Sequence, residues 1–339
     1  MRHIKKYYLN LLDKDRRNLS DIIIYLALCV MSFAYGLVVL IRNVLYDFRI
    51  LPVYTPAKKV ISIGNISWGG SGKTSIAGYL HENISLRFRT ASITKGYARD
   101  EFMMLKERLG DVFDAKDRVS LIKRLEEKFD VFILDDGFQY RRLKRDLDIV
   151  VLTQREFRGY RRLIPAYILR EPILSLKRAN IIVINYWRKI YNINKVKEEI
   201  FSINPKAKIY LADYIYKGFM DRNRRDIALG YFRNRKTGVL TAIGYPAGFI
   251  NLLSSLDIDI SKKIIYPDHY NFSAKEVENI ENDFKKEGIN DIIITRKDFY
   301  HLDLRKASLD YFIMEADLKI ENEEEFLREV NKFIEGDKV

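Results

Sequence analysis

The stretch "SIGNISWGGSGKT", residues 62–74, decides the fold of this 339-residue chain. A phosphate-binding loop needs small residues whose backbone amides converge on phosphate oxygens, a lysine, and a hydroxyl that can ligate Mg²⁺. The residues that supply these features are Gly69, Gly70, Ser71, Gly72, Lys73 and Thr74. We predict an apolar strand at 60–63 and a helix at 75–83, so that the N-terminus of the helix points at the phosphate.

One position of this loop departs from the usual spacing. The pattern G-x-x-x-x-G-K-S/T places its first glycine at position 67, where this chain has Ser67. A small residue can still make such a turn, so the stretch is interpreted as a variant phosphate loop. A chance glycine-rich turn is the alternative.

A second element of a nucleotide site follows in "VFILDDGFQ", residues 131–139. Asp135 and Asp136 come directly after an apolar strand, where a carboxylate can face the Mg²⁺ that Thr74 holds. Paired aspartates at the end of a strand also serve as turn or cap residues. The glycine loop upstream favours the Mg²⁺ site.

The rest of the chain alternates short apolar runs with longer amphipathic stretches. Continuous runs of Val, Ile and Leu indicate strands that are buried on both faces of a parallel sheet. The predicted strands are 60–63, 90–93, 131–134, 147–152, 181–184, 208–211, 239–243, 264–266, 292–294 and 311–314. Helical stretches lie between many of them, for example 120–128 and 275–286. This pattern predicts an α/β fold with a doubly wound, mostly parallel sheet of the P-loop NTPase kind and a second, smaller α/β domain.

We expect three parts along the chain: a membrane anchor at 1–45, a core domain with the P-loop at 46–225 and a smaller α/β domain at 226–339. The basic, weakly periodic segment 217–236 is the best domain junction. A long surface hairpin within one domain is the alternative reading of that segment.

The N-terminal region contains an uncharged apolar run, residues 22–41. Twenty helical residues at about 1.5 Å each span the roughly 30 Å hydrocarbon core of a bilayer. The run is too long for the apolar part of a signal peptide, and no cleavage site is clear. A buried core helix is the alternative to a membrane anchor, which would span the bilayer or lie in one leaflet.

Composition narrows the partners. A net charge of +13 suits nucleic acid, an anionic membrane surface or phosphorylated substrates. The basic residues are dispersed and no nucleic-acid recognition fold appears, so no nucleic-acid partner is expected. The single cysteine, Cys29, allows no internal disulfide and indicates a reducing compartment. Guanine-binding proteins of this class typically carry N-K-x-D, which "TRKD" at 295–298 does not match, so ATP is favoured.

Several motifs occur together in an order found in one family. They are "GNISWGGSGKT" (64–74), "TKGY" (94–97), "LDDGFQYRRLKRDLDIVVL" (134–152), "LREP" (169–172), "AIGYPAGF" (242–249), "PDHYNFS" (267–273) and "TRKD" (295–298). Over roughly residues 60 to 300 they resemble the tetraacyldisaccharide 4'-kinase family, also called lipid A 4'-kinase. "DDGFQ" followed by "RRLKRDLDIV" is the most specific match. The family's phosphate loop tends to carry a hydroxyl residue where Ser67 stands.

The resemblance implies a two-domain lipid kinase on the cytoplasmic face of the inner membrane. It would transfer the γ-phosphate of ATP to the 4'-hydroxyl of an acylated glucosamine disaccharide 1-phosphate in lipid A biosynthesis. An anchored, basic enzyme suits a lipid acceptor that stays in an anionic bilayer. Lys73 and the loop amides would hold the β- and γ-phosphates, while Thr74 and Asp136, with Asp135 close by, would hold Mg²⁺.

The resemblance also implies a proton acceptor for the attacking hydroxyl. Asp100 and Glu101 match the family's Gly-Asp-Glu motif, and His269 matches a histidine that pairs with that aspartate. A carboxylate can orient an imidazole or share its proton. Asp100 and His269 are therefore predicted to be catalytic, and Glu101 is predicted to be a further Mg²⁺ ligand. A hydrogen-bonded loop histidine is the alternative for His269.

Three more residues are assigned through the resemblance. Arg170 would neutralise charge during transfer, Arg118 would bind phosphate or substrate, and Gln139 would orient Mg²⁺-bound water or the nucleophile. Surface salt bridges are the alternative for both arginines. The chain departs from the family at Tyr140, where histidine is usual, and in the short stretch "GYARDEF" (96–102), which lacks the glycine before Asp100.

Two rival functions share part of these features. A membrane-associated P-loop ATPase that switches a partner would need Lys73, Thr74 and Asp136 but neither Asp100 nor a lipid acceptor. A non-enzymatic nucleic-acid binder would use only the basic surface.

Overall fold

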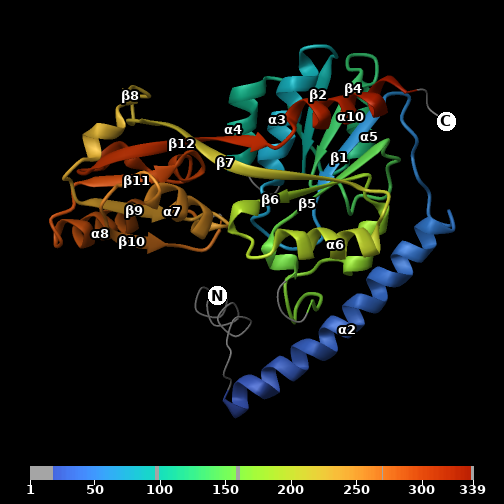
Figure 1. Cartoon of the computed structure of the whole chain (residues 1–339), viewed down its shortest axis with the longest axis horizontal. Coiled ribbons are helices and arrows are strands. Elements are labelled where there is room, and N and C mark those ends of the chain that lie inside the picture. The colour runs from blue at the N-terminus through green and yellow to red at the C-terminus, as the bar shows by residue number, and fades with distance from the viewer. Residues whose placement is uncertain (1–17, 96–98, 158–160, 269, 337–339) are drawn as a thin grey trace.

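The computed structural model of the chain describes residues 18–95, 99–157, 161–268 and 270–336. Within these residues twelve strands form one sheet, and helices cover both of its faces (Figure 1). The sheet has two parallel halves that meet at one antiparallel pair of long strands. The predicted doubly wound α/β fold is thereby confirmed.

The first half of the sheet carries the phosphate loop. Its strands run parallel in the order β3, β2, β4, β1, β5, β6 and β7. Their bounds are β1 Lys59–Gly64, β2 Thr90–Thr94, β3 Val112–Asp114, β4 Val131–Asp135, β5 Leu147–Leu152, β6 Ile181–Asn185 and β7 Lys208–Met220. Helices α3 (Lys73–Ser85), α4 (Arg99–Leu109), α5 (Arg118–Leu125) and α6 (Ile193–Ile203) lie between them in the chain.

The second half continues the same sheet through an antiparallel pairing of β7 with β12. Its parallel strands are β9 (Thr237–Thr241), β10 (Ile260–Ile265), β11 (Asp291–Thr295) and β12 (Asp310–Ile320). Its helices are α7 (Pro246–Ser254), α8 (Ala274–Lys285) and the short α9 (Arg296–Phe299). Figure 1 shows β7 and β12 crossing from one half of the molecule to the other.

All ten predicted strands are present, and their cores lie within one to a few residues of the predicted positions. Two strands that the sequence did not predict are the short β3 and β8 (Asp226–Ile227), which pairs with the end of β7. Strand β7 is far longer than the predicted 208–211. The prediction missed its second part because exposed and half-buried residues alternate there and no apolar run is formed.

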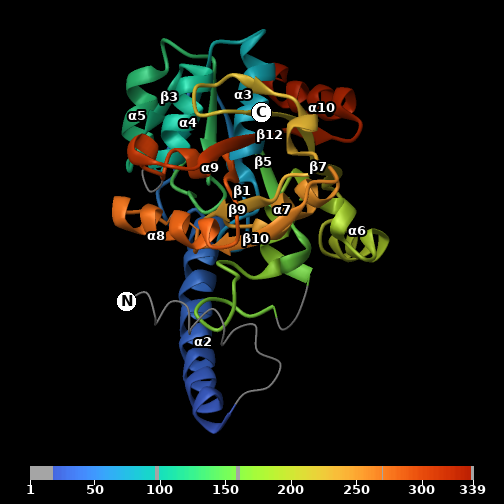
Figure 2. The same ribbon diagram turned by 90° about the vertical axis from the view of Figure 1, so that its left-hand side faces the viewer.

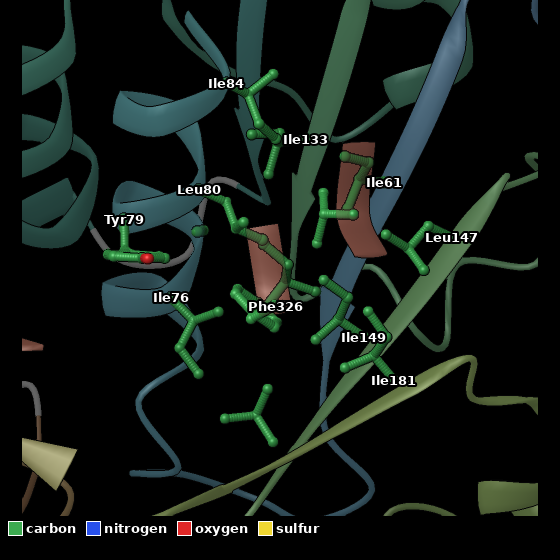
Figure 3. Close-up of a cluster of buried hydrophobic side chains, with 14 of the residues drawn as sticks. Ile61, Ile76, Tyr79, Leu80, Ile84, Ile133, Leu147, Ile149, Ile181 and Phe326 are labelled. Atoms are coloured by element: carbon green, nitrogen blue, oxygen red, sulfur yellow. The ribbon is translucent and has the colours of Figure 1, made fainter. Parts of the chain in front are cut away.

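The hydrophobic core under the phosphate-loop strand draws on distant parts of the chain. Ile61 and Ile149 of the sheet pack against Ile76 and Leu80 of α3, and also against Phe326 of helix α10 (Figure 3). The bounds of α10 are Glu323–Glu335. The end of the chain thus packs in the first half of the sheet. The predicted division at 225/226, and the anchor boundary at 45/46, stay predictions.

Helix α2 (Leu19–Asp47) extends beyond the two halves of the sheet, as Figure 2 shows, and within the described residues it touches the rest of the protein along one side only. It has a mean hydropathy of 2.5 over its most apolar part, and only 11% of that part is buried. By length and composition it can cross a membrane. Large apolar side chains such as Phe33 and Val38 are exposed on it, which is expected for a surface that faces lipid and not for a buried core helix.

Candidate active site

The phosphate loop joins β1 to α3 with a backbone that requires glycine. Gly69, Gly70 and Gly72 have φ angles of 78°, 54° and 84°, in the left-handed region that side chains disfavour. A Cβ at Gly72 would lie 2.3 Å from Nδ2 of Asn185. That amide donates a 2.9 Å hydrogen bond to the Ser71 carbonyl, so Asn185 at the end of β6 holds the loop at the start of α3.

Ser67 accounts for the missing first glycine. It is not among the described residues with positive φ, so this turn does not need glycine. Its hydroxyl donates to the buried carboxylate of Glu156, which also accepts hydrogen bonds from the backbone and hydroxyl of Thr153. Ser67 also pairs with Leu169 in an isolated β-bridge. The side chain and the backbone at position 67 therefore tie the loop to the segment that carries Arg170.

The two aspartates after β4 take different partners. The Thr74 hydroxyl donates to Oδ2 of Asp135 at 2.9 Å. Asp136 accepts two hydrogen bonds from Arg170, at 2.9 and 2.6 Å, and its carboxylate lies 3.8 Å from Nζ of Lys73. Burial acts to raise the pKa of Asp136, but the hydrogen bonds and charge of Arg170, aided by Lys73, hold that pKa well below its usual range.

Thr74 and Asp135 fit a Mg²⁺ site. Their hydroxyl and carboxylate oxygens are neighbours at the head of α3, and oxygen atoms are the ligands that Mg²⁺ prefers. No cluster of three or more potential side-chain ligands occurs among the described residues. Mg²⁺ is usually bound by one or two carboxylates together with substrate phosphates, and such a site does not need a cluster of this kind.

Arg118 lies behind the aspartates and not in front of them. Its side chain is fully buried, and its guanidinium donates to the backbone carbonyls of Asp135 and Asp136, at 2.5 and 3.2 Å. Burial lowers the pKa of this guanidinium, and the two aspartates oppose that shift. The guanidinium also lies 5.5 Å from the ring centroid of Tyr140. This placement gives Arg118 and Tyr140 a part in shaping the aspartate turn.

Gln139 and Asn65 connect the aspartate turn to the loop. Gln139 donates to the backbone carbonyl of Asn65 at 2.7 Å. The Asn65 side chain in turn donates to the Ser71 hydroxyl at 2.9 Å and accepts from Arg170. Sequence reasoning missed Asn65 and Asn185, since a single polar residue at a strand end carries no spacing signal.

These elements open into a cavity of about 1800 Å³. Its walls include residues 69–75, Asp135, Asp136 and Arg170 from the first half of the sheet, and Gly244, Asp268 and Lys297 from the second half. The two halves meet at the loop itself, because a Cβ at Gly70 would lie 2.6 Å from the backbone of Gly244. Arg118 and Gln139 are not among the lining residues.

Tyrosines form a further wall that the sequence did not indicate. The rings of Tyr186 and Tyr214 are stacked with centroids 5.2 Å apart, and Tyr245 lies 4.5 Å from Tyr186. All three line the cavity. Tyr186 follows β6, Tyr214 belongs to β7 and Tyr245 precedes α7, so the cluster joins the two halves beside the phosphate loop.

The predicted proton acceptor is only partly placed. Asp100 and Glu101 fall in the first turn of α4, and their side chains lie outside the described part of the structure. His269 also lies outside the described residues. Its neighbour Asp268 lines the cavity and forms a 2.9 Å ion pair with Lys297. The pairing of Asp100 with His269 therefore stays a prediction.

Comparison with known proteins agrees with this architecture. The chain matches the family described as Tetraacyldisaccharide-1-P 4'-kinase over residues 24–101 and 98–335. Curated relatives include the tetraacyldisaccharide 4'-kinases of Halothermothrix orenii (25% identical, covering 97% of this chain and 98% of the relative) and of Elusimicrobium minutum (29% identical, 93% of each). The crystal structure of LpxK from Aquifex aeolicus in complex with ATP is similar with a TM-score of 0.69 and 25% identity, covering 92% of this chain and 99% of that one. The chain belongs to the tetraacyldisaccharide 4'-kinase family.

Proposed function

We propose that this protein is a lipid kinase that transfers the γ-phosphate of ATP to the 4'-hydroxyl of a tetraacylated glucosamine disaccharide 1-phosphate, a step of lipid A biosynthesis. The observation that carries the proposal is the cavity between the two halves of the sheet. Pockets for one small ligand typically measure about 300–1,000 Å³. A cavity of about 1800 Å³ that begins at the phosphate loop has room for a nucleotide and an acceptor head group.

Each described site residue has a role in such a transfer. Lys73 and the amides at residues 69–72 hold the β- and γ-phosphates, and α3 directs its N-terminus at them. Thr74 and Asp135 are placed to hold Mg²⁺, which neutralises phosphate charge when bound. Asp136 orients Arg170 and Lys73, whose positive charges face the transferring group. This differs from the sequence-based assignment, in which Asp136 was the main Mg²⁺ ligand.

The attacking hydroxyl needs a proton acceptor and an in-line approach. We assign the acceptor to the Asp100–His269 pair, since Asp268 already places the start of "PDHYNFS" in the cavity wall. Gln139 and Arg118 act from behind the aspartate turn by holding its backbone and that of the loop. They are positioning residues in this account, and Glu101 is kept as a further Mg²⁺ ligand.

The setting of the reaction is proposed from helix α2 and the charge of the chain. Helix α2 would anchor the protein in the inner membrane with both halves of the sheet on the cytoplasmic face. The net charge of +13 attracts an anionic lipid surface and a phosphorylated acceptor. No role in nucleic-acid binding is included.

The test is a transfer assay with detergent-purified protein, radiolabelled ATP and the tetraacyl disaccharide 1-phosphate, with and without Mg²⁺. Asp100→Ala and His269→Ala are compared with Arg87→Ala, a change at an exposed residue in the turn after α3, at the opposite end of that helix from the loop. We expect labelled lipid from wild type and Arg87→Ala, and a loss of about 10²-fold or more in the two other variants. ATP hydrolysis without lipid product would instead support an ATPase switch.

A further inference from the structure

One face of the apolar helix α2 carries small and polar residues. Ser32, Tyr35, Gly36, Val39 and Asn43 follow one another at spacings of three, one, three and four residues, which places them on one side of a helix. Ser32 and Val39 are buried, at 6% and 3% exposure, although most of the helix is exposed. This stripe is the side that docks onto the protein.

The stripe docks on the segment 163–171, which leads to the active site. The Ser32 hydroxyl donates to the Leu163 carbonyl at 2.7 Å, and a Cβ at Gly36 would lie 2.9 Å from the Leu163 side chain. The Tyr35 hydroxyl donates to the backbone carbonyl of Arg170 at 2.9 Å. Arg42, about two helical turns beyond Tyr35, forms a 2.8 Å ion pair with the fully buried Glu171.

Arg170 connects the docked helix α2 to the residues of the active site. Its backbone amide donates to the Ile66 carbonyl in the phosphate loop at 2.7 Å. Its guanidinium donates to Asp136 and to Asn65. The backbone of Arg170 is therefore held by the membrane helix on one side and by the phosphate loop on the other.

We propose that Tyr35 is a positioning residue for catalysis: through its hydrogen bond to the Arg170 backbone, the docked helix α2 fixes the guanidinium that holds Asp136. The inference rests on the proposed kinase function. A displacement of about 1 Å at a positioning group lowers rates strongly, whereas ground-state binding of ATP tolerates it better. Tyr35 therefore acts on kcat more than on the KM for ATP.

A pair of variants separates this role from membrane binding. Tyr35→Phe removes one hydroxyl and keeps the ring, whereas Phe33→Leu changes the exposed face of the same helix, where Phe33 is 78% exposed. We expect kcat to fall about five-fold in Tyr35→Phe, as for the loss of one hydrogen bond, with the KM for ATP within about two-fold. Phe33→Leu leaves kcat unchanged. Equal losses in both variants, or no loss in Tyr35→Phe, would overturn the inference.

Two further measurements show whether Tyr35 acts through Arg170. In an Arg170→Lys background, Tyr35→Phe should lower kcat by less than two-fold, because the geometry it supports is already lost. Hydrogen exchange of the amides at 163–171 should accelerate in Tyr35→Phe and stay at the wild-type rate in Phe33→Leu. Additive effects, or unchanged exchange, would contradict the positioning role and leave the kinase function standing. A wild-type protein that phosphorylates no lipid would overturn the kinase function and this inference with it.

Discussion

Arg170 and Asp136 form the ion pair at the centre of the site, with both carboxylate oxygens accepting from one guanidinium at 2.9 and 2.6 Å. The pair links the segment 163–171, on which helix α2 docks, to the strand end that faces the phosphate loop. Asp136 itself has a φ of 52°. A bidentate pair of this kind fixes orientation as well as charge, so the position of each partner depends on the other.

The pair predicts how stability depends on pH. The pKa of Asp136 is depressed in the folded protein relative to its ordinary value of 3.8. The ionised carboxylate therefore contributes its full share of folding stability when the pH is above 3.8, and this share is lost as the pH falls from 3.8 toward the depressed pKa. We expect the stability difference between wild type and Asp136→Asn to stay constant from pH 7 to 5 and to shrink toward pH 3. Urea unfolding across this range measures it. A difference that shrinks already between pH 7 and 6 would contradict the depressed pKa.

Replacing Arg118 is predicted to affect folding before it affects substrate binding. Its buried guanidinium satisfies the carbonyls of Asp135 and Asp136, and Arg118→Met would leave these acceptors without that donor at a cost of about 1–3 kcal/mol. Chemical denaturation should show this loss, while the KM for the lipid changes little in the protein that remains folded. A large rise in that KM at unchanged stability would instead restore the substrate-binding role expected from sequence.

Restoring the usual glycine at position 67 is predicted to harm the protein. Ser67→Gly removes the hydroxyl that donates to Glu156, which is 1% exposed, and adds chain flexibility to the unfolded state. We expect about 1–3 kcal/mol of lost stability and no gain in ATP affinity. Ser67→Ala isolates the hydroxyl from the flexibility term. If Ser67→Gly bound ATP more tightly at equal stability, the structural role of Ser67 would be wrong.

The glycines at 69 and 70 offer a matched comparison. Both have positive φ, but a Cβ at Gly69 meets nothing within 4 Å, whereas one at Gly70 would lie 2.6 Å from the Gly244 backbone. Gly69→Ala should lower the free energy of unfolding only by the backbone strain, about 1–2 kcal/mol. Gly70→Ala should carry the same strain and also push the two halves of the sheet apart. Its Kd for ATP should therefore be about ten-fold or more above that of Gly69→Ala. Titration calorimetry compares them, and equal affinities would contradict the contact between the halves.

The parts of the site that the sequence predicted are those with a fixed spacing. The phosphate loop and the aspartate pair stand at strand ends, and most of the ten strands were visible as apolar runs because they are buried on both faces. Strand β10 is an exception, since half-buried and exposed residues alternate along it. The resemblance added Arg170, which the structure brings to Asp136 from a segment 34 residues away. A recognised family motif can therefore identify a site residue that lies far along the chain from the other residues of the site.

What could not be predicted depends on packing between distant residues. The long pairing of β7 with β12 joins half-exposed strands whose alternation is weak locally. Arg118 looked like a ligand-binding or surface arginine because nothing local shows that its side chain is buried. The docking stripe of α2 was not predicted, because Ser32, Tyr35 and Gly36 lie within an apolar run. The hydropathy of that run predicts a membrane helix but does not indicate which of its sides contacts the rest of the protein.

The most direct test of the proposed kinase activity is the stoichiometry of the reaction: ADP formed per molecule of doubly phosphorylated lipid, with the product's phosphate located by mass spectrometry. We expect one ADP per 4'-phosphorylated lipid, negligible ADP without the acceptor, and loss of both products in Lys73→Ala. ADP production that proceeds at the same rate with and without the disaccharide lipid, and that leaves the lipid unmodified, would contradict this activity.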